Sequence, residues 1–176
     1  MNAEKAAEIL FNCATLLELF HANPHRIARY RYAARVMLQL GADAAAVAGD
    51  PALLRKLGFG ERLSGKLQEL FRTGGLGFYE DLLSDLPYGV VRLMRVPGIG
   101  PKRAFRLYKE LGVSSPAALA AAARRGEVHR LRGFGPRREA EYAAYPGPAP
   151  KPPASAAPDS AAGGGQLAFD FLSQAA

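Results

Sequence analysis

The sequence has a single cysteine and no long apolar run, and each of these shortages excludes a class of protein. One thiol, Cys13, leaves no partner for an internal disulfide and no thiolate set for a zinc site. Its helical spacing from Leu10, Leu16 and Leu17 predicts a buried thiol. No stretch approaches the roughly 20 apolar residues that span a bilayer, and the first residues do not form a basic-then-apolar leader. We therefore expect a soluble, intracellular protein.

Sustained alternation of polar and β-branched residues, the pattern of strands, is also missing. Apolar residues instead recur at steps of three and four from Glu4 to Phe20, which predicts an amphipathic helix. Three more helices are predicted where a capping residue precedes a proline, whose missing N–H costs nothing at a helix start: Asn23-Pro24, Asp50-Pro51 and Ser115-Pro116. The sequence thus predicts an all-α fold.

Acidic residues are outnumbered, with 16 Asp and Glu against 23 Lys and Arg, a net charge of +7. The last 31 residues hold only Lys151, Asp159 and Asp170, so the first 145 carry 22 basic and 14 acidic residues, a net charge of +8. Seventeen of the basic residues are arginines, which grip phosphate bidentately. This charge favours a nucleic-acid partner, although RNA or a membrane surface would suit it as well as DNA.

One pattern occurs three times: an apolar approach, a Gly-x-Gly turn with an apolar residue between the glycines, and a basic amphipathic helix. The copies run over Leu57–Leu67, Val96–Tyr108 and Leu131–Tyr142. Their glycine pairs are Gly58 and Gly60, Gly98 and Gly100, and Gly133 and Gly135; the central residues are Phe59, Ile99 and Phe134; and the following cations are Arg62, Lys102 and Arg137. We expect the central side chains to fill the space between paired helices, which makes each copy a helix-hairpin-helix motif.

The second glycine of each copy starts a helix whose unpaired N–H groups can hold a phosphate oxygen, and a basic residue two positions later can neutralise the charge. The middle copy, with Gly98, Gly100, Lys102 and Arg103, is the best phosphate site. Glu61 opposes phosphate in the first copy, as does the acid-containing end of the third. Such contacts predict sequence-independent, salt-sensitive DNA binding. The alternative is that some copies only pack helices together.

These segments resemble the N-terminal lyase-like and helix-hairpin-helix region of the bacterial family X DNA polymerases. The likeness covers residues 4–142 and is carried by NPHRIARYRYAARVMLQL, LGFGERLSGKLQELFRTGGL and LMRVPGIGPKRAFRLYKELGV. The nucleotidyl-transfer domain with its metal-binding aspartates and the histidine-rich phosphoesterase domain have no counterpart among these residues. We therefore expect that the chain alone is not a polymerase.

The resemblance implies a deoxyribose-phosphate lyase site, with Lys66 at the position of the Schiff-base nucleophile. By the same likeness, His25, Arg26, Tyr30 and Arg62 hold the 5′ phosphate and sugar. Glu61 and Phe78 depart from the family pattern and weaken the expected phosphate pocket. The alternative is that Lys66 is an ordinary solvated lysine. Tyr30, Arg31 and Tyr32 interleave aromatic and basic side chains that could stack on a base, or Tyr30 could cover the core.

After residue 145 the sequence becomes rich in Pro, Ala and Gly, which predicts a disordered linker over 146–165. QLAFDF within residues 166–172 resembles the short peptide that docks bacterial repair proteins on the sliding clamp. Its contact residues would be Gln166, Leu167, Phe169 and Phe171. The alternative is a tail that folds back on the domain.

We therefore expect a lyase-like helical domain over 1–80 and a second helical domain with two hairpins over 81–145. The favoured function is a cytoplasmic, nucleoid-associated protein that binds gapped, nicked or distorted DNA in repair or replication, tethered to the clamp. The rivals are an abasic-site lyase that uses Lys66 and an adaptor whose hairpins bind protein. No metal site or membrane partner is expected, and the resemblance implies no cofactor beyond a monovalent cation at a hairpin turn.

Overall fold

A computed structural model describes residues 1–145, which contain ten α-helices, one 3₁₀ helix and no strand. The predicted all-α class is confirmed. The helices fall into two compact units, Met1–Ser84 and a second that begins at Asp85. The division lies at the end of α6 (Gly77–Ser84), whereas the sequence pattern placed it after residue 80. The linker over 146–165 and the peptide over 166–172 lie outside the described residues.

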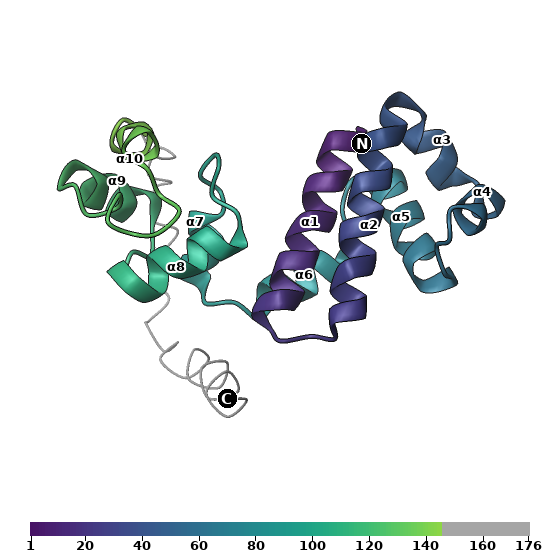
Figure 1. Cartoon of the computed structure of the whole chain (residues 1–176), viewed down its shortest axis with the longest axis horizontal. Helices are drawn as coiled ribbons and strands as arrows, with labels where there is room; N and C mark the ends of the chain where they lie inside the picture. The colour runs from purple at the N-terminus through teal and green to yellow at the C-terminus, as the bar shows by residue number, and fades with distance from the viewer. Residues whose placement is uncertain (146–176) are drawn as a thin grey trace, which may run out of the picture. The chain divides into compact units, whose positions relative to one another are not determined.

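In the first unit, α1 (Ala3–Leu19) and α2 (Pro24–Leu40) lie side by side, joined by a short turn (Figure 1). They bury Leu10, Leu16 and Met37 between them. The single thiol, Cys13, is completely buried on α1, and burial raises its pKa to about 12. The prediction of a buried Cys13 is therefore confirmed.

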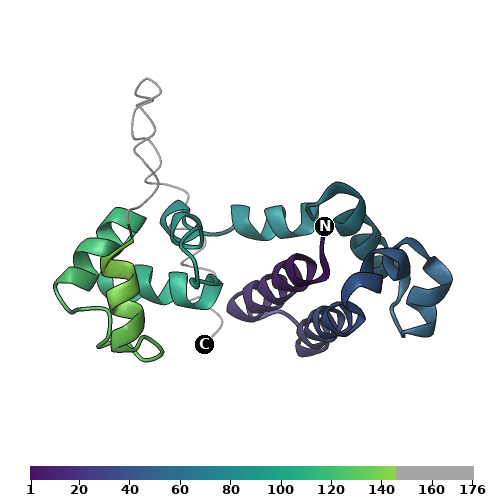
Figure 2. The same ribbon diagram turned by 90° about the horizontal axis from the view of Figure 1, so that it is seen from above.

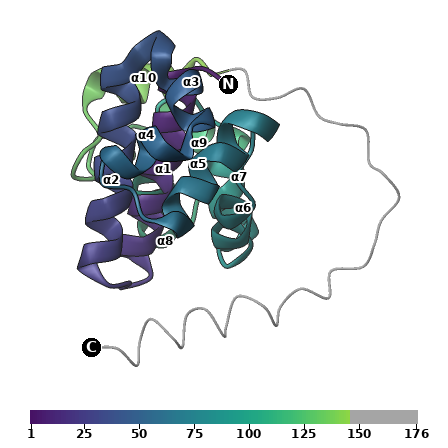
Figure 3. The ribbon, with the colours of Figure 1, turned by 90° about the vertical axis from the view of Figure 1, so that its right-hand side faces the viewer.

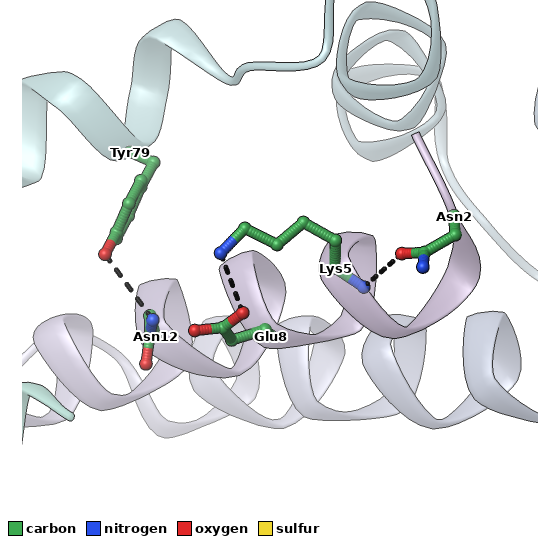
Figure 4. Close-up of polar contacts among 5 residues, drawn as sticks. All are labelled: Asn2, Lys5, Glu8, Asn12 and Tyr79. Carbon is green, nitrogen blue, oxygen red and sulfur yellow. Dashed lines mark hydrogen bonds and ion pairs between the residues drawn. The ribbon is translucent and has the colours of Figure 1, made fainter. Parts of the chain in front are cut away.

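Four shorter helices and one 3₁₀ turn complete the first unit. They are η1 (Gly41–Asp43), α3 (Ala44–Gly49), α4 (Pro51–Lys56), α5 (Glu61–Thr73) and α6. Both α3 and α4 contact α5 (Figure 3), and α6 contacts α1. Figure 4 shows Asn12 of α1 donating to the Tyr79 hydroxyl of α6 over 3.5 Å, together with the Asn2 cap of α1. The pocket described below is therefore built on a packed helical frame.

The second unit consists of α7 (Tyr88–Leu93), α8 (Pro101–Leu111), α9 (Pro116–Arg124) and α10 (Pro136–Ala143). α7 packs on α8, and α9 packs on α10. The green ribbons of α9 and α10 lie together in Figure 2. Its fully buried side chains include Val90, Leu93, Leu107, Leu119 and Val128. These residues make a small apolar core that holds two glycine turns in place.

The predicted helix starts are confirmed by side-chain caps. The Asn23 carboxamide accepts from the His25 N–H over 2.8 Å, the Asp50 carboxylate from the Ala52 N–H over 2.7 Å, and the Ser115 hydroxyl from the Ala118 N–H over 3.1 Å. A proline stands at the first helical position in each case. Among residues 1–145, no helix combines the length and apolar character needed to cross a membrane.

Candidate nucleic-acid interface

The three predicted glycine turns share one backbone geometry. The first glycine of each pair, Gly58, Gly98 or Gly133, has a positive φ of 80°, 77° or 92°. A side chain would strain that conformation, which explains why glycine is needed there. The second glycine is extended and caps the following helix, α5, α8 or α10. The repeat read from the sequence is therefore a repeat of structure.

The apolar residue between the glycines is buried in every copy, as predicted. Phe59 is 3 % exposed, Ile99 4 % and Phe134 4 %. The N–H of each donates to a carbonyl of the preceding segment, at 3.0 Å for Phe59 and Ile99 and 3.1 Å for Phe134. Each turn is thus held to the core from inside, so that its outer backbone faces solvent.

The starts of α5, α8 and α10 differ from those of the helices that carry side-chain caps. α1, α2, α4 and α9 each begin with an Asn, Asp or Ser side chain that accepts from an amide of the first turn. The three hairpin helices begin with glycine and have no side-chain cap hydrogen bond. Their first N–H groups are therefore left available to an external acceptor such as a phosphate oxygen.

The third turn differs from the other two in what precedes it. Residues 125–132 form a loop that separates α9 from the turn, so the preceding helix ends further from the glycines than in the other two copies. The Glu139 carboxylate of α10 fixes the loop by accepting from the Val128 and His129 N–H groups over 2.9 and 3.0 Å. Its second oxygen lies 2.6 Å from the His129 Nδ1. Glu139 belongs to the acidic segment that was expected to oppose phosphate in this copy, and in the structure it supports the turn.

Cations surround the turns of the second unit. Lys102 and Arg137 are exposed, and Arg103 donates from its Nη1 to the Gly98 carbonyl over 2.9 Å. Arg138, from the third hairpin, places its Nη1 2.9 Å from where a Gly98 Cβ would lie, while Arg106 of α8 donates to the Arg132 carbonyl. Each of these two hairpins therefore places an arginine side chain against the turn of the other. The sequence analysis did not predict these contacts, because they join residues far apart in the sequence.

The turn of the first hairpin opens on a cavity of about 750 Å³ between the start of α2 and the start of α5. Most of its lining is cationic or aromatic, and it brings together six residues that the sequence analysis selected. The lining residues are Asn23, His25, Arg26, Arg29, Tyr30, Gly60, Glu61, Arg62, Leu63 and Lys66. We call this cavity the α2–α5 pocket.

Lys66 lies in this pocket over the ring of Phe78. Its Nζ is 3.9 Å from the ring centroid, and the Arg26 guanidinium carbon is 4.8 Å from the same centroid. Tyr30 stacks on Phe78 with 5.5 Å between ring centroids. Burial against these rings lowers the pKa of Lys66, and the charge of Arg26 lowers it further, while Glu69 acts in the opposite direction. More of the neutral, nucleophilic amine is therefore present near neutral pH than in an ordinary lysine.

The other aromatic and basic residues of α2 have different surroundings. Tyr30 is only 5 % exposed, and burial raises the pKa of its phenol to about 12. Arg31 points away from the α2–α5 pocket and pairs with Glu18 at 2.7 Å. Tyr32 braces the first hairpin, since its hydroxyl donates to the Leu57 carbonyl over 3.1 Å. Arg29, which the sequence analysis missed, lies with its Nη2 3.3 Å from where a Gly60 Cβ would stand.

Comparison with known proteins agrees with this geometry. The family model for a SAM-like helix-hairpin-helix tandem matches residues 90–141, which contain the second and third glycine turns. The DNA polymerase/3′-5′ exonuclease PolX of Bacillus subtilis (strain 168) is 29 % identical over 153 residues, or 87 % of this chain. The chain resembles a family X DNA polymerase. It covers only 26 % of the length of PolX, whose polymerase and exonuclease activities are stated for that protein alone.

Proposed function

We propose that the chain binds DNA by seating backbone phosphates on its glycine turns. The helix-hairpin-helix tandem and the likeness to PolX both support DNA binding. The observation that carries the proposal is the threefold repeat of one turn geometry that leaves helix-start amides uncapped beside arginine and lysine side chains. Because amides and cations read phosphate rather than base edges, this binding is independent of sequence.

We further propose that the preferred DNA is gapped, nicked or otherwise distorted, as met in repair and replication. The α2–α5 pocket supports this preference. It is closed on one side by Tyr30 and carries His25, Arg26, Arg29 and Arg62 on its walls, which suits the terminal phosphate of an interrupted strand better than a continuous backbone. The protein would accordingly work in the cytoplasm on the nucleoid.

Binding of the whole chain to matched intact, nicked, gapped and flapped duplexes tests this function. We expect tighter binding to interrupted duplexes than to the intact one. Lys102→Ala combined with Arg103→Ala should weaken binding to every duplex, since these residues flank the best exposed turn. Lys5→Ala is the matched control, because Lys5 pairs with Glu8 on α1, far in sequence from any turn. A chain that binds no duplex even at low salt would favour the protein-adaptor alternative.

A second function, deoxyribose-phosphate lyase activity, is favoured by the surroundings of Lys66. In the proposed step, the Nζ lone pair attacks the C1′ aldehyde of a 5′-incised abasic sugar, water leaves, and an imine forms that permits β-elimination of the phosphate. Borohydride should then trap a covalent adduct with Lys66, and Lys66→Ala should abolish it while Lys56→Ala does not. Adduct yield should rise with pH through a pKa below the ordinary 10.5. Equal trapping in both variants would contradict the role of Lys66.

Two partners of the whole chain remain proposals. The terminal peptide would dock on the sliding clamp through Gln166, Leu167, Phe169 and Phe171. Loss of clamp binding in the double variant Leu167→Ala with Phe171→Ala would test this.

The resemblance also implies a monovalent cation at a hairpin turn. At the second turn the Gly98 carbonyl already accepts from the Arg103 guanidinium, so that turn does not fit such a cation without moving Arg103.

A further inference from the structure

Tyr88 is an aromatic side chain that the fold holds out in solvent. It is the first residue of α7 and is 72 % exposed. The other large hydrophobic residues exposed among residues 1–145 are between 36 % and 46 % exposed. Burial of a tyrosine ring is normally favourable, so exposure to this degree needs an explanation.

The backbone beside Tyr88 is fixed on both sides. Pro87 caps α7, and its carbonyl accepts from the Val90 N–H over 2.9 Å. Gly89 is packed so closely that a Cβ there would lie 2.7 Å from the Ser114 Cβ and 3.1 Å from the Tyr108 ring. One turn further, Val90 and Leu93 are fully buried. The ring is therefore exposed because α7 is anchored by its opposite face, not because the helix end is loose.

A cation lies beside Tyr88 on α7, and further exposed residues follow it in the sequence up to the second glycine turn. Arg92 lies one helical turn after Tyr88, with its guanidinium carbon 5.8 Å from the centroid of the Tyr88 ring. Arg95 follows three residues later, and Arg92, Arg95 and Gly98 are all exposed. We call the surface formed by Tyr88, Arg92 and Arg95 the α7 stripe. It combines one flat aromatic ring with two exposed cations, the second of which precedes Gly98 by three residues in the sequence.

We propose that Tyr88 stacks on an unpaired nucleobase of a DNA strand whose phosphates follow Arg92 and Arg95 to the Gly98 turn. This inference rests on the DNA binding proposed above and assigns a residue to its preference for gapped DNA. Every base offers a π-face, so such stacking needs no particular sequence. In an intact duplex those faces are covered by neighbouring base pairs, and the ring gains no partner. The cations of the α7 stripe favour a nucleic acid over an apolar protein partner.

Tyr88→Ala in the full chain tests the proposal by comparing gapped with intact duplex. We expect affinity for the gapped duplex to fall roughly 5- to 150-fold, the range of one base–aromatic stack, with intact-duplex affinity unchanged. Tyr88→Phe should retain wild-type affinity because it keeps the ring. The matched control is Phe11→Ala, since Phe11 is an exposed aromatic on α1 among Glu4, Glu8 and Glu18.

A fluorescence measurement provides a second readout, because the chain contains no tryptophan. Tyr88→Trp introduces a single indole at the tip of the α7 stripe. Its emission should be quenched by gapped duplex, through contact with a base, and should stay unchanged with intact duplex bound to the same occupancy.

The results separate this inference from the function on which it rests. If the wild-type chain binds no DNA, the proposed function fails. If it binds gapped DNA and Tyr88→Ala binds equally well, or loses the same affinity for intact duplex, only the assignment of Tyr88 fails. An indole emission that ignores gapped DNA would also overturn the assignment.

Discussion

At the scale of single residues, the first glycine of each hairpin is the position where the chain has least freedom to change. Gly98 has a φ of 77°, and a Cβ there would meet the Arg138 Nη1 at 2.9 Å. Gly98→Ala should therefore lower the free energy of unfolding by about 1–2 kcal/mol, measured by urea denaturation. Gly135→Ala is the matched control, because its φ is −94° and its Cβ would meet nothing within 4 Å. Equal losses in the two variants would show that the turn geometry is not what requires glycine at residue 98.

Phe78 makes contacts that its residue type alone does not predict. Taken as a departure from the family pattern, it was expected to weaken the phosphate pocket because it carries no charge. In the structure its ring lies under both Lys66 and Arg26 and against Tyr30. The ring can hold both cations on its face, while the burial of Lys66 in these surroundings lowers the pKa of its amine.

At the scale of elements, one carboxylate of α10, that of Glu139, accepts two backbone hydrogen bonds from the loop over 125–132. Desolvation raises the pKa of Glu139, but hydrogen bonds from the His129 N–H and ring and from the Val128 N–H outweigh it and hold the pKa below its ordinary value of 4.5. A depressed pKa adds stability above the unfolded-state value, and that stability is lost as the pH falls through the lower, folded-state value. The second unit should therefore loosen in acid.

Glu139→Gln is the variant that tests this dependence. It should reduce stability at pH 7, where the carboxylate is charged, and it should show a smaller further loss than the wild type when the pH is taken from 6 to 3. Urea denaturation followed by circular dichroism at each pH gives the comparison. Glu8→Gln provides the control, since the Glu8 carboxylate meets only the exposed Lys5. A wild-type acid dependence that Glu139→Gln leaves intact would contradict the account.

The same scale shows what sequence patterns can and cannot predict. Helix starts at Asn23, Asp50 and Ser115 were predicted correctly because a cap acts within three residues of itself, and the glycine turns because their strain is local. The crossing of Arg106 and Arg138 between hairpins was not predicted, since it depends on how α8 and α10 meet. The loop over 125–132 between α9 and the third turn was not predicted either, since the hydrogen bonds that hold it come from Glu139, ten residues or more further along the chain.

In the candidate site, too, sequence patterns predicted some residues and missed others. The likeness to family X selected Lys66 and four neighbours that the structure gathers in the α2–α5 pocket. Arg31, selected instead because it alternates with Tyr30 and Tyr32, lies outside the pocket, since residues next to each other on a helix point about 100° apart. Helical spacing could have found Arg29, which stands three and four residues after Arg26 and His25 on one face of α2.

At the scale of the whole molecule, charge and hairpins together predict how strongly salt opposes DNA binding. Residues 1–145 carry a net charge of +8, and in the proposed binding mode each of the three turns holds at least one phosphate. Three neutralised phosphates correspond to a slope of about −3 in a plot of log affinity against log salt concentration. Titrations with intact duplex between 50 and 300 mM salt should give this slope or a steeper one. A flat dependence would mean that the turns do not contact the DNA backbone.

The burial of Cys13 has a practical consequence for tracing the path of a bound strand. Its thiol is sealed inside α1 and α2, and with a pKa of about 12 it stays protonated and inert toward maleimides at neutral pH. One new cysteine at a solvent-exposed position away from the turns, such as Ala45→Cys on α3, would therefore take a dye alone in an otherwise unaltered chain. Energy transfer from that dye to labelled oligonucleotides would map where each strand end lies.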